Sequence, residues 1–253
     1  MNGIYQLPEY YEIAFSFRDI PREVDALEEA ARRFAEIPVK TFLEIGCGNS
    51  PHMDELTGRG YDFIGIDISD EMLTYSMEKA KKLGTHTRFL KANMVDFRID
   101  RAVDFAFVML GSLYVKNSEE LVSHFDAVAR TLRPGGLYLL DWCVRFDIQD
   151  FSEDSWEVEK NGVVVKASFA SRVLDKVKQL YEDTECLEIL EDGEVKKVEG
   201  TSVKRVIFPQ EFSFFISARS DFEFLGWWND WDLSAPLSGD GKINRPIILL
   251  RRT

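Results

Sequence analysis

A glycine turn between two short apolar runs constrains the fold of this chain more than any other feature. The run Lys40–Gly46 leads into Gly-Cys-Gly, and a second run, Asp62–Asp67, ends in an acidic residue. In open α/β sheets, such a turn lets backbone N–H groups approach a ligand, and an acid ending the second strand can hold ribose hydroxyls. Asp67 follows Gly46 by 21 residues, close to the roughly 20 expected at a nucleoside site. The two runs predict a parallel α/β sheet with a nucleoside site.

Strand-like and helix-like stretches alternate through the first 150 residues, which favours a parallel sheet. Ser69 and Gly84 occupy the N-cap and C′ positions of one predicted helix. Asn117 and Glu120 resemble a capping box that opens another, which stops at Pro134-Gly135-Gly136. The other elements expected in this part are helices at 8–15 and from 21 onward, and strands at 86–90, 103–110 and 137–143.

The pattern changes after residue 150. Asn161-Gly162 is a typical two-residue hairpin turn, and the turn around Asp192-Gly193 joins two further strand-like runs. A helix at 209–219 and strands at 222–228 and 245–252 are expected near the C-terminus, the last strand returning to the main sheet. We therefore divide the chain into 1–150 (N-terminal helices and the core), 151–208 (an antiparallel β subdomain) and 209–253 (a helix and two strands that complete the core sheet).

The charge of the chain argues against a polynucleotide substrate. It carries 31 Lys and Arg against 44 Asp and Glu, a formal net charge of −13, and no basic block that could neutralise phosphates. The three cysteines are widely spaced, so neither a disulfide framework nor a metal site is expected. No signal peptide and no membrane span are recognisable, and we expect a soluble, cytoplasmic protein without nucleic-acid or membrane partners.

Four motifs then occur in order over about residues 40–143. Glu44-Ile45-Gly46-Cys47-Gly48 resembles the first motif of the class I S-adenosylmethionine-dependent methyltransferases, and Asp67 resembles their ribose-binding acid. Residues 92–97 are similar to the loop that holds adenine, and residues 132–136 resemble the turn before strand five. The resemblance implies an α/β fold with a Rossmann-like seven-stranded sheet, N-terminal helices and a β insertion after strand five. The implied cofactor is S-adenosyl-L-methionine.

The layout is similar to small-molecule methyltransferases of the sugar N,N-dimethyltransferase and glycine or sarcosine types. Tyr10-Tyr11-Glu12, the stretch 109–114 and the position of the β insertion carry this likeness. In such enzymes the N-terminal helices and the insertion roof the cofactor. The resemblance implies a small-molecule methyl acceptor, favours N- over O-methylation, and is compatible with a homodimer through the β subdomain.

The resemblance also implies which residues bind the cofactor. Two positions depart from the family pattern: Ser50 replaces a third glycine beside the methionyl part, and Asn93 replaces the usual adenine-loop aspartate. The Asn93 carbonyl can still accept a hydrogen bond from the adenine amino group, and Met94 can pack on the ring. The expected cofactor-binding set is Tyr11, Glu44, Gly46, Cys47, Gly48, Asp67, Ile68, Met72, Asn93, Met94 and Leu110, with no metal.

Acceptor-side candidates should lie at the carboxyl ends of strands, where open α/β sheets place ligands. We expect Tyr114 and Asp141 there, with Tyr11 from the N-terminal roof, and Asp141 to orient or deprotonate an amine. The alternatives are a surface or Arg145-paired Asp141 and ordinary packing for the two tyrosines. His52 is expected at the surface, His124 in a structural role, and the tryptophans at 227, 228 and 231 in the core.

Three functions are compatible with these features. A small-molecule methyltransferase is favoured. A protein or RNA methyltransferase is the first alternative, although the acidic charge and the absence of a Pro-Pro-Tyr segment at residues 109–112 weigh against RNA. The second alternative is a non-catalytic module that holds S-adenosylmethionine, because a fold does not determine function.

Overall fold

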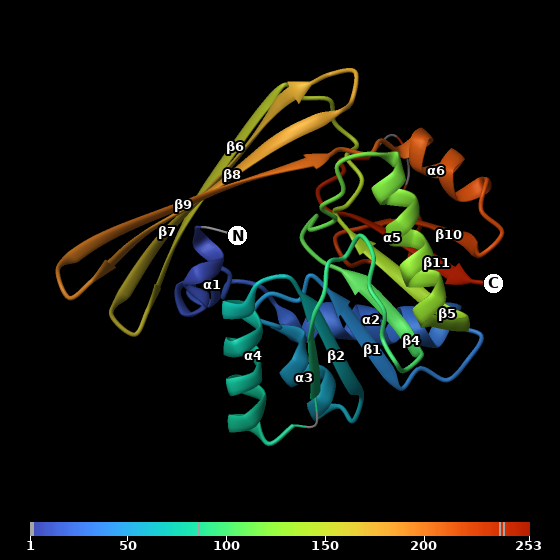
Figure 1. Ribbon diagram of the computed structural model, residues 1–253, viewed down its shortest axis with the longest axis horizontal. Helices are drawn as coiled ribbons and strands as arrows, with labels where there is room; N and C mark the ends of the chain where they lie inside the picture. The colour runs from blue at the N-terminus through green and yellow to red at the C-terminus, as the bar shows by residue number, and fades with distance from the viewer. Residues whose placement is uncertain (1–2, 86, 238, 240) are drawn as a thin grey trace.

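The computed structural model describes residues 3–85, 87–237, 239 and 241–253. A seven-stranded sheet with the order β10-β11-β5-β4-β1-β2-β3 forms its core (Figure 1). Neighbours among β1 to β5 run parallel, and β11 runs antiparallel to both β5 and β10. The predicted Rossmann-like sheet is confirmed, with the C-terminal strand inserted beside β5. Its strands are β1 (Thr41–Ile45), β2 (Asp62–Asp67), β3 (Thr87–Lys91), β4 (Val103–Val108), β5 (Leu132–Asp141), β10 (Phe222–Asn229) and β11 (Pro246–Arg252).

Helices cover both faces of this sheet, each through its own apolar cluster. On one face lie α2 (Ile20–Phe34), α3 (His52–Gly58) and α4 (Asp70–Leu83). On the other lie α5 (Ser118–Thr131) and α6 (Pro209–Ser217). Because both faces are covered, β1 and β4 are buried along their whole length, and apart from Thr41, Glu44 and Asp104 their residues are apolar, as in most parallel strands.

The helix ends follow the capping residues in the sequence. Ser69 Oγ accepts a hydrogen bond from the Met72 N–H, and Gly84 ends α4 in the left-handed region at φ 67°. Asn117 Oδ1 accepts from the Glu120 N–H at 2.8 Å, so the predicted cap of α5 is confirmed. The Glu120 side chain accepts from Lys116 N, not from Asn117 N, so only half of the capping box forms.

The β insertion is a four-stranded antiparallel sheet in the order β6-β7-β8-β9. Asn161 and Gly162 both have positive φ, at 55° and 81°, as a type I′ hairpin turn requires. Figure 1 shows this sheet as a long twisted ribbon that extends beyond the core, with α1 beneath it. The strands and the two N-terminal elements are β6 (Phe151–Lys160), β7 (Val163–Asp175), β8 (Leu180–Glu191), β9 (Glu194–Arg205), η1 (Ile4–Gln6) and α1 (Pro8–Ala14).

One face of this insertion, which we call the inner face, packs against η1 and α1. Val165 pairs with Ile189 and Ala167 with Leu187, and all four side chains are buried in a cluster with Ile4 and Ala14. Since side chains alternate along a strand, the odd-numbered residues of β7 and β8 point to this face. The N-terminal segment therefore lies between the insertion and the core, as the resemblance implied for a roof.

A few boundaries differ from the sequence prediction. The third strand begins at Thr87, and His86, where we expected it to begin, lies outside the described residues. Strand β4 ends at Val108 because Leu110 turns into the left-handed region at φ 54°. Strand β5 already begins at Leu132, so Pro134-Gly135-Gly136 falls inside its range. Within the described residues, no helix is long and apolar enough to cross a membrane.

Candidate active site

The glycine loop after β1 and the acid at the end of β2 are joined directly. Asp67 Oδ2 accepts a hydrogen bond from the Gly48 N–H and Oδ1 accepts from the Ser69 N–H, both at 2.8 Å. Gly46 and Gly48 have φ values of 69° and 50°, and a Cβ added at Gly48 would meet nothing within 4 Å. The loop backbone at Gly48 is thus open to a ligand. Burial raises the pKa of Asp67, while the backbone N–H donors oppose that rise.

Ser50 takes the place of the third family glycine without changing the loop conformation. It adopts φ 48°, the left-handed region that glycine favours, and its N–H donates to the Cys47 carbonyl at 2.7 Å. The Cys47 thiol points to Gly65, where an added Cβ would lie 2.8 Å from Sγ. Cys47 can therefore reach a cofactor through its backbone, as the glycine turn predicts.

The loop after β3 lies beside this turn. A Cβ at Gly46 would be 3.2 Å from Met94 Cε, and the Tyr114 N–H donates to Met94 Sδ at 3.2 Å. Met94 therefore lies between the glycine loop and the segment after β4. Asn93 is exposed, and its Oδ1 accepts a hydrogen bond from the Val95 N–H at 3.0 Å. The side-chain NH2 of Asn93 remains able to donate to a ligand.

His124 supports this loop from beneath. Its Nδ1 lies 2.7 Å from the Met94 carbonyl and its Nε2 lies 2.6 Å from the Tyr138 hydroxyl. Because a carbonyl can only accept, Nδ1 donates to Met94 and Nε2 accepts from Tyr138. Burial lowers the pKa of His124 to about 4, so the ring is neutral near pH 7. The predicted structural role of His124 agrees with this geometry.

Two other predicted cofactor residues, Ile68 and Met72, lie very differently. Ile68 is exposed directly after Asp67, where its side chain can cover a bound nucleoside. Met72 is fully buried in the first turn of α4 and faces the core. The contact of Met72 with the cofactor, expected from the resemblance, stays a prediction. The Met72 backbone N–H donates to the capping Ser69 Oγ.

Glu44 belongs to a buried charge network that the sequence did not reveal. Glu44 Oε1 lies 2.8 Å from His52 Nδ1, and His52 Nε2 lies 2.9 Å from Glu23 Oε2. Glu23 also pairs with Arg18 at 2.5 Å and with Arg245 at 3.2 Å. His52 is 0% exposed, so its predicted surface position is wrong. This network ties the glycine strand to α2, to the N-terminal segment and to the start of β11.

The protonation of the network follows from its geometry. Burial alone would lower the pKa of His52, but the Glu44 and Glu23 carboxylates raise it above its usual value. Burial alone would raise the pKa of Glu23, but the hydrogen bond from His52 and the Arg18 charge lower it to about 2. The second oxygen of Glu44, Oε2, is buried without a hydrogen-bond partner among the described residues. An amino group is a fitting donor for it.

The structure assigns Asp141 a different role from the predicted acceptor contact. Its side chain is 0% exposed, and both oxygens accept from Arg245, at 2.8 Å and 2.7 Å. Oδ2 also accepts from the Leu110 N–H at 2.7 Å. A carboxylate engaged in this way holds the turn after β4 and cannot orient an amine. The pairing residue is Arg245, 104 residues away, and not the neighbouring Arg145 considered from the sequence.

This geometry gives a specific expectation for Asp141→Asn. The variant keeps an acceptor for Leu110 N but loses the charge opposite Arg245, so it should lose about 1–3 kcal/mol of stability. Cofactor affinity and any transfer activity should then decline together, because the Leu110 turn shifts. Thermal unfolding and calorimetry measure the two effects. Normal stability with a selective loss of transfer would restore the predicted acceptor role.

Three half-buried tyrosines gather where the N-terminal segment meets the insertion and the core. The rings of Tyr5 and Tyr11 are 5.7 Å apart, and Lys204 Nζ of β9 lies 5.2 Å from the Tyr114 ring centroid. Burial, followed by the charge of Glu185, raises the pKa of Tyr11 and of Tyr114. The charges of Asp67 and Glu44 also raise the pKa of Tyr11. The predicted Tyr11 and Tyr114 thus share an electrostatic environment, in which the Glu185 charge raises the pKa of both.

Tyr5 and Glu185 were not predicted. Burial raises the pKa of Tyr5, and Tyr114, Glu185 and Tyr11 add to it. Burial also raises the pKa of Glu185, which Tyr5 and Lys204 oppose. The alternation of residues along β8 could have indicated Glu185. It shares a strand face with Leu187 and Ile189, two residues of the apolar cluster that packs against α1. A carboxylate on an apolar face that meets the core is a candidate site residue.

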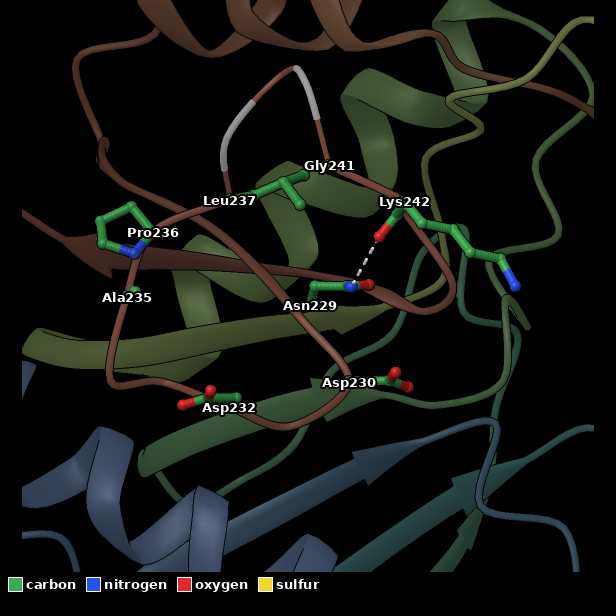
Figure 2. A pocket seen from close by; sticks show the side chains of 8 residues that line it. All are labelled: Asn229, Asp230, Asp232, Ala235, Pro236, Leu237, Gly241 and Lys242. Atoms are coloured by element: carbon green, nitrogen blue, oxygen red, sulfur yellow. Dashed lines mark hydrogen bonds between the residues drawn. The ribbon is translucent and has the colours of Figure 1, made fainter.

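A separate hollow of about 280 Å³ lies between the turn after β10 and the segment before β11. Figure 2 shows it lined by loop residues, with the Asn229 side chain donating to the Lys242 carbonyl at 3.1 Å. None of its lining residues belongs to the glycine loop, the tyrosines or the insertion. We assign it no part in the chemistry. The nearby Trp228 and Trp231 are buried in the core, as expected.

The residues around the glycine loop fit S-adenosylmethionine. Gly48 offers an open backbone, Asp67 ends β2 with a carboxylate, and two buried polar atoms, Glu44 Oε2 and Ser50 Oγ, have no hydrogen-bond partner among the described residues. Residues 42–136 match the methyltransferase domain family. Residues 42–136 are therefore similar to a methyltransferase domain, and the seven-stranded sheet and glycine loop around them are those of the class I S-adenosylmethionine-dependent fold.

Known proteins resemble the chain in sequence and in fold. It is 28% identical over 102 residues to the dTDP-3-amino-3,4,6-trideoxy-alpha-D-glucopyranose N,N-dimethyltransferase of Streptomyces venezuelae, covering 40% of this chain and 41% of the relative. In this relative and two further curated ones, the matched region spans 41% to 50% of the relative's length.

Two solved structures cover nearly the whole chain. An S-adenosylmethionine-dependent methyltransferase from Clostridium acetobutylicum has a TM-score of 0.77 at 16% identity, covering 96% of each chain. CalS10, an amino pentose methyltransferase from Micromonospora echinaspora with S-adenosylmethionine bound, has a TM-score of 0.71 at 17% identity, again covering 96% of each. At these identities the likeness shows a shared fold, including the β insertion.

Proposed function

We propose that this protein transfers the methyl group of S-adenosylmethionine to the nitrogen of a small-molecule amine. The observation that carries the proposal is the group formed by Tyr5, Tyr11, Tyr114 and Glu185, between the insertion and the glycine loop. The charges of Asp67 and Glu185 both raise the pKa of Tyr11, which supports an acceptor held by Glu185 near the cofactor residues. The dimethyltransferase relative, which acts on an amino sugar by its name, supports the same class of acceptor.

The side chains have separate tasks in this proposal. When bound, the cofactor supplies an electrophilic methyl group on a sulfonium, and the protein contributes alignment and a water-poor surrounding. Glu185 attracts the ammonium form of the acceptor and takes up its proton, for which its raised pKa is suitable. Tyr11 and Tyr114 stay protonated and orient the neutral amine through their hydroxyls.

N-methylation is favoured over O-methylation by the same groups. A hydroxyl acceptor needs a base strong enough to remove its proton as the methyl is transferred. The tyrosines have raised pKa values and do not ionise near neutral pH, and both ring nitrogens of His124 are occupied by Met94 and Tyr138. An amine needs only to lose its ammonium proton, which a carboxylate such as Glu185 can accept.

Methyl transfer to defined acceptor pools tests the proposal. The purified chain is supplied with S-adenosylmethionine and with amine, hydroxyl, peptide or RNA pools, and formation of S-adenosylhomocysteine and of methylated product is followed by mass spectrometry. We expect product in the amine pool. Product confined to peptide or RNA would show a macromolecular methyltransferase. Cofactor binding without any product would favour a binding module.

A further inference from the structure

Beyond Glu185, the inner face of the insertion carries a further pair of polar residues. Phe169 pairs with Glu185, and the next inner-face pair along β7 and β8 is Ser171 with Asp183. Positions two residues apart on one strand face lie about 7 Å apart. The spacing along the strand between Glu185 and this polar pair is therefore comparable to the length of a small molecule.

Ser171 and Asp183 are buried although they are polar. Each is 1% exposed. Asp183 Oδ2 lies 2.7 Å from Lys204 Nζ, while Asp183 Oδ1 and Ser171 Oγ have no hydrogen-bond partner among the residues that the structure describes. Burying such atoms without a partner is unfavourable, so native proteins seldom do so without a reason.

The pair also lies beside the segment that follows β4. Lys204 Nζ, which neutralises Asp183, donates to the Gly111 carbonyl at 3.4 Å, in the segment between Leu110 and Tyr114. Lys204 Nζ also lies 5.2 Å from the Tyr114 ring centroid, so Lys204 is next to both Asp183 and Tyr114. Through Tyr114 and Met94 the pair is linked to the glycine loop at Gly46.

We propose that Asp183 and Ser171 form a specificity subsite that binds a hydroxyl group of the acceptor, next to the nitrogen held at Glu185. This inference rests on the proposed amine N-methylation. A carboxylate oxygen can only accept, so the acceptor must supply a donor there. Because Lys204 already balances the Asp183 charge, the subsite suits a neutral hydroxyl and not a second ammonium. The acceptor class is an amine with a hydroxyl across a ring or short chain.

Paired acceptors test this subsite. 4-Aminocyclohexanol and 3-amino-1-propanol are compared with cyclohexylamine and propylamine, which lack the hydroxyl, in the wild-type protein and three variants. Ser171→Ala should raise KM for the hydroxylated amines about 3- to 10-fold, with kcat little changed, and leave KM for the deoxy amines unchanged. Asp183→Asn should have a larger effect of about 10- to 100-fold. Ser168→Ala is the matched control, because Ser168 is on the opposite face of the same strand.

Each outcome has a definite meaning. A preference of the wild type for hydroxylated amines that Ser171→Ala abolishes and Ser168→Ala preserves supports the subsite. Equal use of both members of each pair, or an equal effect of the two serine variants, overturns it and leaves amine methylation intact. If Asp183→Asn does not fold, Ser171→Ala decides alone, since it keeps the Asp183–Lys204 pair. If the wild type methylates no amine, the proposed function fails, and this inference fails with it.

Discussion

Asp67→Ala should weaken binding of S-adenosylmethionine by about 100-fold or more, the largest effect on affinity expected of any single residue. Hydrogen bonds to a charged group contribute about 1.5–3 kcal/mol each, and a ribose offers two hydroxyls. The structure adds a second loss, because Asp67 also accepts from the Gly48 and Ser69 N–H groups. Removing the carboxylate therefore loosens the glycine loop as well as the ribose contact. Isothermal calorimetry with S-adenosylmethionine and S-adenosylhomocysteine measures the change.

Asp62→Ala is the matched control for this experiment. Asp62 begins the same strand that Asp67 ends, and its exposed carboxylate pairs only with Arg101 among the described residues. Its removal should leave cofactor affinity within about twofold of the wild type. Normal affinity of Asp67→Ala would contradict the ribose role. An equal loss in both variants would point to a general weakening of β2.

The pH dependence of binding gives an independent check of Asp67. Burial raises its pKa, and ribose hydroxyls bind the ionised form, so binding should favour loss of the proton. Affinity should fall as the pH drops through the raised pKa of Asp67. Asp67→Asn should bind more weakly at neutral pH, and its affinity should vary less over the same acidic range.

The core of the fold could be predicted because its information is local. Ser69 and Gly84 mark the two ends of α4 within 16 residues, and Asn161-Gly162 specifies its hairpin by the left-handed conformation of both residues. The glycine loop and Asp67 meet because parallel neighbouring strands bring their carboxyl ends together. Each of these relations is set by spacing along a short stretch of chain.

Asp141 and His52 show where local information ends. The Asp141 pairing with Arg245 depends on the insertion of β11 beside β5, which brings together residues 104 positions apart. His52 begins a short helix, a position usually exposed, yet Glu23 of α2 and Glu44 of β1 enclose it. Neither environment can be derived from neighbouring residues. The packing of α2 against α3 creates the environment of His52, and the insertion of β11 beside β5 creates that of Asp141.

The sequence did not predict the residues on the acceptor side, among them Glu185 and Tyr5, for a related reason. Alternation along β8 puts Asp183, Glu185 and Leu187 on one face, and this much is visible in the sequence. Which end of that face lies over the core depends on how the insertion leaves β5 and returns at α6. Tyr5, near the N-terminus, reaches Glu185 only because η1 packs beneath the insertion. Long-range placement, and not residue type, decided these contacts.

Glu23→Gln should destabilise the protein by roughly 3–5 kcal/mol, the largest stability change expected from one substitution. Glu23 is the common acceptor for Arg18, His52 and Arg245 in a buried setting, and removing one member of such a group leaves charges without compensation. For a chain of this size, each kcal/mol corresponds to about 2–4 °C in Tm, so a decrease of about 6–20 °C is expected. Glu29→Gln, which breaks an exposed pair with Arg33 on the same helix, should change Tm by no more than about 2 °C.

The pH profile of unfolding separates this network from a general packing defect. The pKa of Glu23 is lowered from 4.5 to about 2, so its contribution is present above about pH 4.5 and is lost as the pH falls toward 2. The pKa of His52 is raised above 6.5, so its contribution is full below pH 6.5 and is lost as the pH rises through the folded value. Wild-type stability from the network should therefore be greatest between about pH 4.5 and 6.5, and Glu23→Gln should flatten both flanks. If the variant shifts the whole curve down without changing its shape, Glu23 acts through packing, and the charge network is not what holds the glycine strand to α2.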